Sequence, residues 1–290
     1  MYSGFNQYVV TFSDNSRPMF NTIGVITKPK DYTSEQTGYK LSVFLKTQGV
    51  TLVDGIDAIR ERADLIIVVG GDGTILNTAR TFVDDNIPIL GVNLGHLGFL
   101  VDLAVESMTE AVGEILEGKY IKEKRALLSC QVERGDKVLS KHLAFNEAVI
   151  HRNHTPRMLN FDLYVDGDFV NNQRSDGIII ATPTGSTAYS LSSGGPIVHP
   201  SVNAISMVSI CPHTMSHRPV VLHGESEVLI HVLDSVERAT VSFDGQSTMP
   251  NQSGDKLRVK QHENFIHLIH PKRYDYFKII RTKLHWGRKV

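Results

Sequence analysis

The sequence predicts an α/β domain built on a parallel sheet, followed by a second domain rich in β-strands. Apolar runs alternate with helix-like segments between residues 22 and 116, which is typical of parallel sheets with right-handed crossovers. One run, 65–69, is apolar throughout, as expected of a strand buried on both faces. Beyond Tyr120 the pattern changes to short β-rich runs. We therefore place the α/β domain at 1–123, the β-rich domain at 124–263, and at 264–290 a tail that can pack back on the first domain.

The elements of the first domain follow from periodicity along the chain. Strands are expected at 22–26, 50–53, 66–69 and 88–92. Helices are expected at 34–47, 75–83 and 105–116. In the first of these helices, Tyr39, Val43 and Phe44 are expected to form the apolar face. Residues 1–20 show no clear period and are interpreted as a loose extension.

The second domain is predicted from β-rich runs separated by turn signals. These runs cover 128–132, 143–150, 161–165, 178–182, 204–210, 228–232, 240–243 and 257–259. Asp166-Gly167 lies between alternating residues and predicts a hairpin, and Asp244-Gly245 marks another turn.

The composition is that of an ordinary globular protein, with 41% hydrophobic and 21% charged residues among 290. A formal net charge of −1 argues against general binding to nucleic acid or to an acidic membrane. No stretch approaches the roughly 20 apolar residues of a membrane span, and the N-terminus lacks the pattern of a secretion signal. Cys130 and Cys211 are expected to be free and buried, as in a cytoplasmic protein.

No metal site is predicted from motif spacing. The sequence holds 13 histidines, but His-Glu-x-x-His and Cys-x-x-Cys are both absent. The nucleophile elbow Gly-x-Ser-x-Gly and the loop Gly-x-x-x-x-Gly-Lys are absent as well. We therefore assign no metal-ligating side chain.

The most informative stretch is the glycine-rich loop Gly70-Gly71-Asp72-Gly73-Thr74, which follows the buried run. Its glycines let the backbone turn sharply and approach a ligand without a Cβ in the way. Thr74 is expected to cap the following helix, whose free N–H groups would attract phosphate. The presence of Asp72 in a loop that would bind phosphate needs a physical reason, because a carboxylate repels phosphate. A metal ion or a proton to be taken from a hydroxyl supplies one, and a tight turn with a solvated aspartate is the alternative.

A second cluster, Asn146-Glu147, interrupts the apolar run 143–150. Burying an amide and a carboxylate without partners costs roughly 1–3 kcal/mol or more for each group. The pair could bind the two hydroxyls of a ribose. The alternatives are a satisfied structural pair or a strand end in water.

A third cluster combines Asp176-Gly177 with the stretch 182–196, which is rich in small hydroxyl residues and glycine. Hydroxyls and free N–H groups can bind a heterocycle or a phosphate, and Tyr189 offers a flat face for stacking. The alternative is a flexible linker, but the stretch directly follows an apolar strand and contains Pro183 and Pro196, which a linker does not need.

Taken together and in order, these stretches resemble the NAD kinase family, and most closely its bacterial members. The resemblance is carried by Gly70–Thr74, Asn146-Glu147, Asp176-Gly177 and 182–190, supported by 91–100, and it runs from about residue 22 to the C-terminus. Diacylglycerol and sphingosine kinases have loops similar to the first stretch, whereas the Thr-Ala-Tyr-Ser core of 187–190 is specific. Residues 1–20 lie outside the resemblance, and His96 is assigned no role.

The resemblance implies transfer of the ATP γ-phosphoryl group to the 2′-hydroxyl of the adenosine ribose of NAD. It implies that Asp72 is the base, that Asn146 and Glu147 hold adenosine and ribose groups, and that Asp176 receives the nicotinamide end. Further residues implied to bind nucleotide are Gly73, Arg157, Arg174, Thr187, Ala188, Tyr189, Ser190, Leu191, Ser192 and Gln246. The family uses a divalent cation, usually magnesium, and forms homodimers or homotetramers.

Two other functions compete with this interpretation. A lipid kinase of the diacylglycerol or sphingosine type would need a greasy acceptor site, whereas the loop around Tyr189 favours a polar nucleotide. A non-catalytic dinucleotide-binding regulator would gain nothing from Asp72 beside phosphates. If Asp72 and Tyr189 contact one NAD, the ligand is expected between the domains or between subunits.

Overall fold

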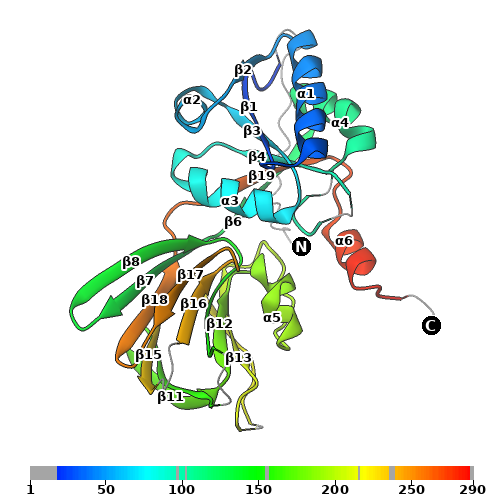
Figure 1. Ribbon diagram of the computed structural model, residues 1–290. Helices are drawn as coiled ribbons and strands as arrows, with labels where there is room; N and C mark the ends of the chain where they lie inside the picture. The colour runs from blue at the N-terminus through cyan, green and yellow to red at the C-terminus, as the bar shows by residue number, and fades with distance from the viewer. Residues whose placement is uncertain are drawn as a thin grey trace, which may run out of the picture. The chain divides into compact units, whose positions relative to one another are not determined.

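The structure is a computed structural model that describes residues 18–95, 98–101, 103–153, 157–214, 216–234 and 239–287. His96 therefore lies outside the described residues, as do residues 1–17 of the N-terminal extension. The chain divides into two compact units, one comprising Met1–Lys124 and Ile266–Val290 and the other comprising Arg125–Phe265. Each unit has its own sheets (Figure 1).

The first unit is built on a seven-stranded sheet with the order β2-β1-β3-β4-β19-β6, in which β5 also pairs with β4. Five pairs of neighbouring strands are parallel, namely β2 with β1, β1 with β3, β3 with β4, β4 with β5, and β4 with β19. The strands are β1 (Thr22–Thr27), β2 (Thr51–Val53), β3 (Leu65–Val69), β4 (Ile89–Asn93), β5 (Leu103–Ala104), β6 (Tyr120–Arg125) and β19 (Ile266–Pro271). The predicted α/β fold with a parallel sheet is confirmed.

Helices cover both faces of this sheet (Figure 1). They are α1 (Tyr32–Thr47), α2 (Ile56–Arg62), α3 (Asp72–Phe82) and α4 (Met108–Leu116), and a further helix, α6 (Tyr276–Lys283), follows β19. The helices α1 and α4 share one hydrophobic core with β3, whereas a Cβ on Gly24 or Gly91 of the sheet would meet Ile59 of α2 or Ile75 of α3. The α2 helix, of seven residues, was not predicted because its one buried side chain leaves no periodic pattern.

The apolar face predicted for α1 is wrong for two of its three residues, whereas Phe44 is partly buried and packs against the core of the first unit. Tyr39 is 73% exposed and Val43 is 47% exposed, whereas Thr37, Leu41 and Leu45 are buried. The buried residues are spaced four apart, which places them on one face of a helix. Because the buried face includes the polar residue Thr37, a search for hydrophobic residues alone favours the neighbouring face with Tyr39 and Val43.

The second unit contains two antiparallel six-stranded sheets whose facing side chains form one core. One sheet has the order β11-β10-β15-β18-β7-β8, with strands Asp168–Ser175, Leu159–Val165, Val228–Asp234, Asp255–Gln261, Leu128–Arg134 and Lys137–Ala144. The other has the order β14-β13-β12-β9-β16-β17, with strands Val220–His223, Ala204–Ile210, Gly177–Ala181, Glu147–His151, Ala239–Phe243 and Ser247–Asn251. Phe161 and Val259 of the first sheet and Ile150 and Ile178 of the second belong to the same core. The predicted β-rich architecture is confirmed.

Both predicted turns are present. Asp166 and Gly167 have φ values of 52° and 89° and connect β10 to β11, as a two-residue hairpin with positive φ requires. Asp244 and Gly245, with φ values of 53° and 65°, begin the connection from β16 to β17.

The C-terminal segment contains regular structure where the sequence suggested a tail. Leu268 and Ile269 of β19 pair in parallel with Ile89 and Leu90 of β4, which places β19 in the sheet of the first unit. The α6 helix follows, with the Asp275 carboxylate accepting the Lys278 N–H at its N-terminus.

Both cysteines are free, and the expected burial holds for one of them. Cys130 is buried within β7, and burial raises the pKa of its thiol. Cys211 is exposed, contrary to expectation. It follows the last residue of β13 and has a φ of 44°, so the chain leaves the sheet at this point and carries the side chain into solvent.

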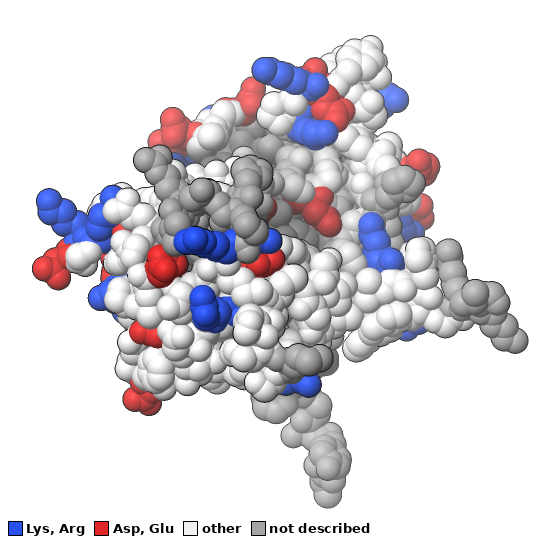
Figure 2. All heavy atoms as spheres, turned by 60° about the horizontal axis from the view of Figure 1, so that its bottom comes forward, with Lys and Arg blue, Asp and Glu red and all other residues white. Residues whose placement is uncertain are grey.

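The surface carries charges of both signs. On the face shown in Figure 2, lysine and arginine side chains are interspersed with aspartate and glutamate. Within the described ranges, no helix combines the length and hydrophobicity needed to cross a membrane.

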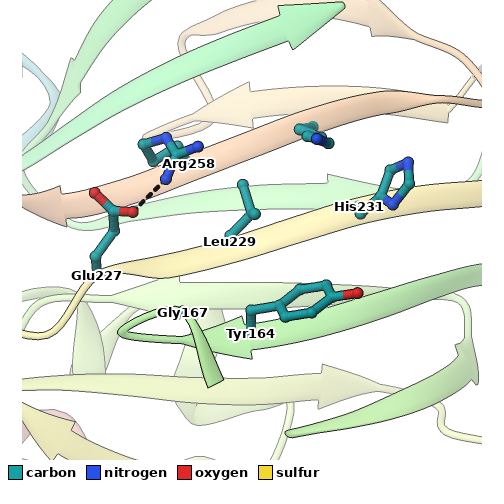
Figure 3. A pocket seen from close by; sticks show the side chains of 7 residues that line it. Tyr164, Gly167, Glu227, Leu229, His231 and Arg258 are labelled. Carbon is teal, nitrogen blue, oxygen red and sulfur yellow. Dashed lines mark hydrogen bonds and ion pairs between the residues drawn. The ribbon is translucent and has the colours of Figure 1, made fainter. Parts of the chain in front are cut away.

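A hollow on the sheet of β10, β15 and β18 is shown in Figure 3. Its lining includes Tyr164, Leu229 and His231, with Arg258 at one end. The Arg258 guanidinium bonds to Glu133 at 2.8 Å and also pairs with Glu227. The Arg258 guanidinium therefore links β18 to Glu133 of β7 and to Glu227, which directly precedes β15. These carboxylates neutralise the charge of Arg258 within the sheet.

Candidate active site

The glycine-rich loop joins β3 to α3 and places Asp72 at the first residue of the helix. The Asp72 carboxylate accepts the N–H of Phe99 at 3.0 Å on Oδ2 and the N–H of Leu100 at 3.1 Å on Oδ1. The positive end of the helix dipole also favours a carboxylate at this position. Asp72 is half-buried and its neighbours Gly71 and Gly73 are exposed, so the carboxylate is fixed in orientation at an accessible surface.

Thr74 does not cap α3, contrary to prediction. The helix begins at Asp72, Gly71 occupies the N-cap position, and no side chain caps it. Thr74 lies in the first turn, and its Oγ1 would be 2.6 Å from a Cβ on Gly70. The glycine at 70 therefore gives Thr74 room to pack against the turn, and the helix starts three residues earlier than a threonine cap implies.

Gly98 forms part of the cradle around the Asp72 carboxylate. A Cβ added at Gly98 would lie 2.1 Å from Oδ1 of Asp72 and 2.9 Å from its Cγ. No such contact is tolerated, so a side chain at Gly98 would displace the carboxylate from the Phe99 and Leu100 N–H groups.

Gly98→Ala is therefore expected to lower kcat by about 10²-fold, the size of effect that a misplacement of about 1 Å can cause. Gly95→Ala is the matched control, because a Cβ at Gly95 meets nothing within 4 Å and its φ is not in the left-handed region. Steady-state kinetics of both variants check the expectation. Equal kcat values for the two variants would show that the close fit of Gly98 to the Asp72 carboxylate does not affect turnover.

The predicted strand 143–150 is broken in the middle. β8 ends at Ala144 and β9 begins at Glu147, so Phe145 and Asn146 lie between strands. The cause is Asp244, whose carboxylate accepts the N–H groups of Phe145 at 2.9 Å, Asn146 at 2.7 Å and Glu147 at 3.1 Å. Asp244 is 8% exposed. Sequence reasoning saw it only as part of a turn.

Glu147 is a buried carboxyl without a partner for one of its oxygens. The residue is 6% exposed, and its Oε2 is buried with no hydrogen-bond partner among the residues that the structure describes. Burial raises the pKa of Glu147 to about 8, and the neighbouring charge of Asp244 adds to the rise. An oxygen in this state is suited to a ligand hydroxyl that hydrogen-bonds to it.

The stretch after β12 is a fixed structure, and the flexible-linker alternative is wrong. Thr182 and Ser186 are at most 1% exposed. The Thr182 hydroxyl donates to the Phe145 carbonyl at 2.7 Å and accepts the Gly185 N–H at 3.1 Å. A Cβ at Gly185 would lie 2.1 Å from the Asn146 carbonyl oxygen. The glycine thus lets this stretch pack directly on the Asn146 backbone.

Two of the predicted clusters, Asn146-Glu147 and the stretch after β12, meet at one end of the β9, β12 and β16 strands. Ala181 of β12 pairs with Glu147 of β9, and the Asp244 N–H donates to the Glu147 carbonyl at 3.0 Å. The N-terminal end of β9 therefore lies beside the C-terminal ends of its two antiparallel neighbours. This end carries the loops that hold Asn146, Glu147, Gln246 and the residues 182–192.

The remaining residues of that stretch differ in accessibility. Tyr189 begins the short α5 helix (Tyr189–Ser192) and is 44% exposed, which leaves its ring face accessible. Ser190 is fully buried, and its hydroxyl has no hydrogen-bond partner within the described ranges. Thr187, Ala188 and Leu191 are half-buried, and Ser192 is exposed.

Asp176 lies at the opposite end of β12. Its carboxylate takes the Arg152 guanidinium at 2.6 Å and 3.2 Å, a two-pronged ion pair that sequence reasoning missed. The five residues Gly177–Ala181 separate it from the Glu147 end, or about 16 Å at the usual strand rise. Arg157 and Arg174 are exposed, as is Gln246.

Tyr189→Ala is expected to weaken NAD binding about ten- to a hundredfold, since a base stacked on an aromatic ring gains about 1–3 kcal/mol. Tyr189→Phe should keep most of the affinity, because only the hydroxyl is lost. Calorimetric titration with NAD measures both. An alanine variant that binds within twofold of wild type would exclude stacking on this ring.

Comparison with protein families identifies both halves of the chain. The N-terminal domain of ATP-NAD kinases matches residues 17–120, and the C-terminal domain of ATP-NAD kinases matches residues 145–270. The NAD kinase of Hydrogenovibrio crunogenus is 45% identical over 94% of this chain and 100% of its own. That of Thiobacillus denitrificans is 39% identical over 93% of this chain and 99% of its own.

Solved structures agree with the sequence comparison. Yeast NADH kinase in complex with NADH superposes with a TM-score of 0.84 at 25% identity, over 94% of this chain and 89% of that one. An NAD kinase from Archaeoglobus fulgidus in complex with ATP has a TM-score of 0.70 at 25% identity, over 91% and 97% of the two chains. The chain belongs to the NAD kinase family of phosphotransferases.

Proposed function

We propose that this protein transfers the γ-phosphoryl group of ATP to the 2′-hydroxyl of the adenosine ribose of NAD, giving NADP. The observation that carries the proposal is the Asp72 carboxylate, held by two backbone N–H groups at the start of α3. Each carboxylate oxygen has two acceptor positions, so each can still accept a further hydrogen. A ribose hydroxyl has a pKa far above 7, and a positioned base typically speeds its reaction 10²- to 10⁴-fold.

The β-rich unit supplies the groups that we assign to the dinucleotide. The Glu147 oxygen accepts a ribose hydroxyl, and Asn146 lies next to it in the chain. Tyr189 stacks on a base. Asp176 takes the nicotinamide end, with Arg152 as the positioning residue that fixes its carboxylate. We also assign to dinucleotide binding the accessible side chains of Arg157, Arg174 and Gln246.

A divalent cation, which we take to be magnesium, fits the donor set of the loop. Mg²⁺ retains several waters and is usually held by one or two carboxylates together with substrate phosphates. Asp72 offers one carboxylate, and the described residues contain no group of three or more His, Cys, Asp or Glu side chains that could hold a metal. A cation carried mainly by the ATP phosphates suits this arrangement, where it would neutralise phosphate charge.

One assay tests the function against its two competitors. The purified protein is incubated with ATP, magnesium and either NAD or diacylglycerol, and NADP is read with an NADP-specific dehydrogenase. We expect NADP from NAD and no phosphorylated lipid. Phosphorylation of diacylglycerol alone would favour the lipid kinase, and NAD binding without any NADP would favour the non-catalytic regulator.

A further inference from the structure

Arg125 is a buried cation at the point where the chain enters the second unit. It is the last residue of β6 and the first residue of that unit, and it is 2% exposed. Burying a guanidinium is costly unless the group is paired and hydrogen-bonded. An arginine at this depth therefore needs specific partners, and the identity of those partners indicates what the side chain does.

One partner of Arg125 lies in the stretch 182–192. Nη1 of Arg125 donates to Oγ1 of Thr184 at 3.2 Å, and Thr184 itself is 7% exposed. The two residues lie 59 positions apart in the chain. Within the described ranges, no other charged side chain bonds to this stretch. Because a hydrogen bond from an ionised group is roughly twice as strong as a neutral one, Arg125 is a strong fixed point for the stretch.

The residue that Arg125 holds begins the turn before Tyr189. Thr184 occupies the N-cap position of the single 3₁₀ turn η3 (Gly185–Thr187), and its carbonyl accepts the Thr187 hydroxyl at 3.2 Å. The α5 helix follows with Tyr189, and no side chain caps it. The backbone of η3 therefore determines where the exposed ring of Tyr189 lies, and the hydrogen bond from Arg125 fixes the start of that backbone.

We propose that Arg125 is a positioning residue for NAD, which holds η3, and with it the Tyr189 ring, in the conformation that binds the dinucleotide. It acts through the Thr184 hydroxyl and is not assigned a contact with the ligand. Holding the turn in advance saves the cost of ordering it when the ligand binds. The assignment rests on the proposed function, because it takes NAD as the ligand of this stretch.

Two variants remove the contact from its opposite ends. Arg125→Lys keeps the charge but replaces the planar guanidinium with a compact ammonium group that cannot reproduce its geometry. Thr184→Val removes the hydroxyl and keeps the size of the side chain. Arg134→Lys is the matched control, because the Arg134 guanidinium bonds to Asp255 at 2.7 Å and 3.0 Å and not to the stretch 182–192.

The test combines calorimetric titration with NAD, steady-state kinetics and hydrogen–deuterium exchange of the free protein. We expect both contact variants to lose at least about fivefold in NAD affinity, since binding must then order the turn, with kcat at saturating NAD within about threefold of wild type. The N–H groups of Ser186 and Ala188, bonded within the turn region at 3.1 Å and 2.9 Å, should exchange faster than in wild type. Exchange in β13 (Ala204–Ile210) should not change, and Arg134→Lys should match wild type in NAD affinity and in exchange of the turn.

The outcomes separate this assignment from the proposed function. NAD affinity within twofold of wild type in either contact variant would overturn the assignment, as would an equal loss in Arg134→Lys or faster exchange spread equally over β13. Thr184→Val leaves Arg125 in place, so it stays informative even if Arg125→Lys fails to fold. A wild-type protein that binds NAD without making NADP would overturn the proposed function, while the NAD titrations still decide the role of Arg125.

Discussion

Asp72→Asn is expected to nearly abolish turnover while NAD affinity stays within about tenfold of wild type. The amide keeps the size of the side chain but cannot take a proton from the ribose hydroxyl. It can also keep at most one of the two backbone contacts, because its NH₂ group cannot accept the N–H of Phe99 or Leu100. Single-turnover formation of NADP and calorimetric titration with NAD measure the two effects separately.

The matched control for this variant is Asp57→Asn, which neutralises an exposed carboxylate in the first turn of α2. We expect its turnover to be within twofold of wild type. Activity of Asp72→Asn above about a tenth of wild type, at saturating magnesium, would remove Asp72 from the role of base. A large loss of NAD affinity in the same variant would point instead to a collapse of the loop.

Four strands of the first unit's sheet, β1 to β4, could be predicted because they are largely apolar runs that need no knowledge of their neighbours. All five residues of β3 are fully buried, and each is apolar. The α2 helix and the β14 and β17 strands were missed because they are short and mostly exposed, so burial leaves no periodic pattern in them. β19 was missed because its parallel partner β4 lies far away in sequence.

The motifs of the site were visible in the sequence, but the contacts that hold them were not. Asp72 was singled out, yet its donors are backbone groups of Phe99 and Leu100, which have no side-chain signature. Asp244 accepts three N–H groups from residues nearly a hundred positions away, and a turn signal alone cannot show this. Arg152 was overlooked because nothing in the chain marks it as the partner of Asp176.

Glu147→Ala is expected to weaken NAD binding about ten- to a hundredfold, because a hydrogen bond between a carboxylate and a ribose hydroxyl is worth roughly 1.5–3 kcal/mol. The structural basis is a buried oxygen that has no hydrogen-bond partner in the described part of the chain. The titration is best run near pH 9, above the raised pKa of about 8, where the carboxylate is charged in the free protein. Glu147→Gln, which keeps the shape, should fall between alanine and wild type. Unchanged NAD affinity in Glu147→Ala, with only a lower Tm, would make the residue structural.

The same carboxyl is expected to make stability depend on pH. Burial raises the pKa of Glu147 from 4.5 to about 8 in the folded protein, so the unfolded chain releases this proton first as pH rises. The stability that the protonated form contributes is fully present below about pH 4.5 and is lost as pH rises through 8. Each pH unit in that window changes the free energy of unfolding by up to about 1.4 kcal/mol. Glu147→Gln carries no titrating proton, so its Tm should fall less than that of wild type between about pH 5 and 9 and exceed it at pH 9. Parallel Tm curves for the two proteins would show that Glu147 is charged when buried and that the Oε2 atom has a partner after all.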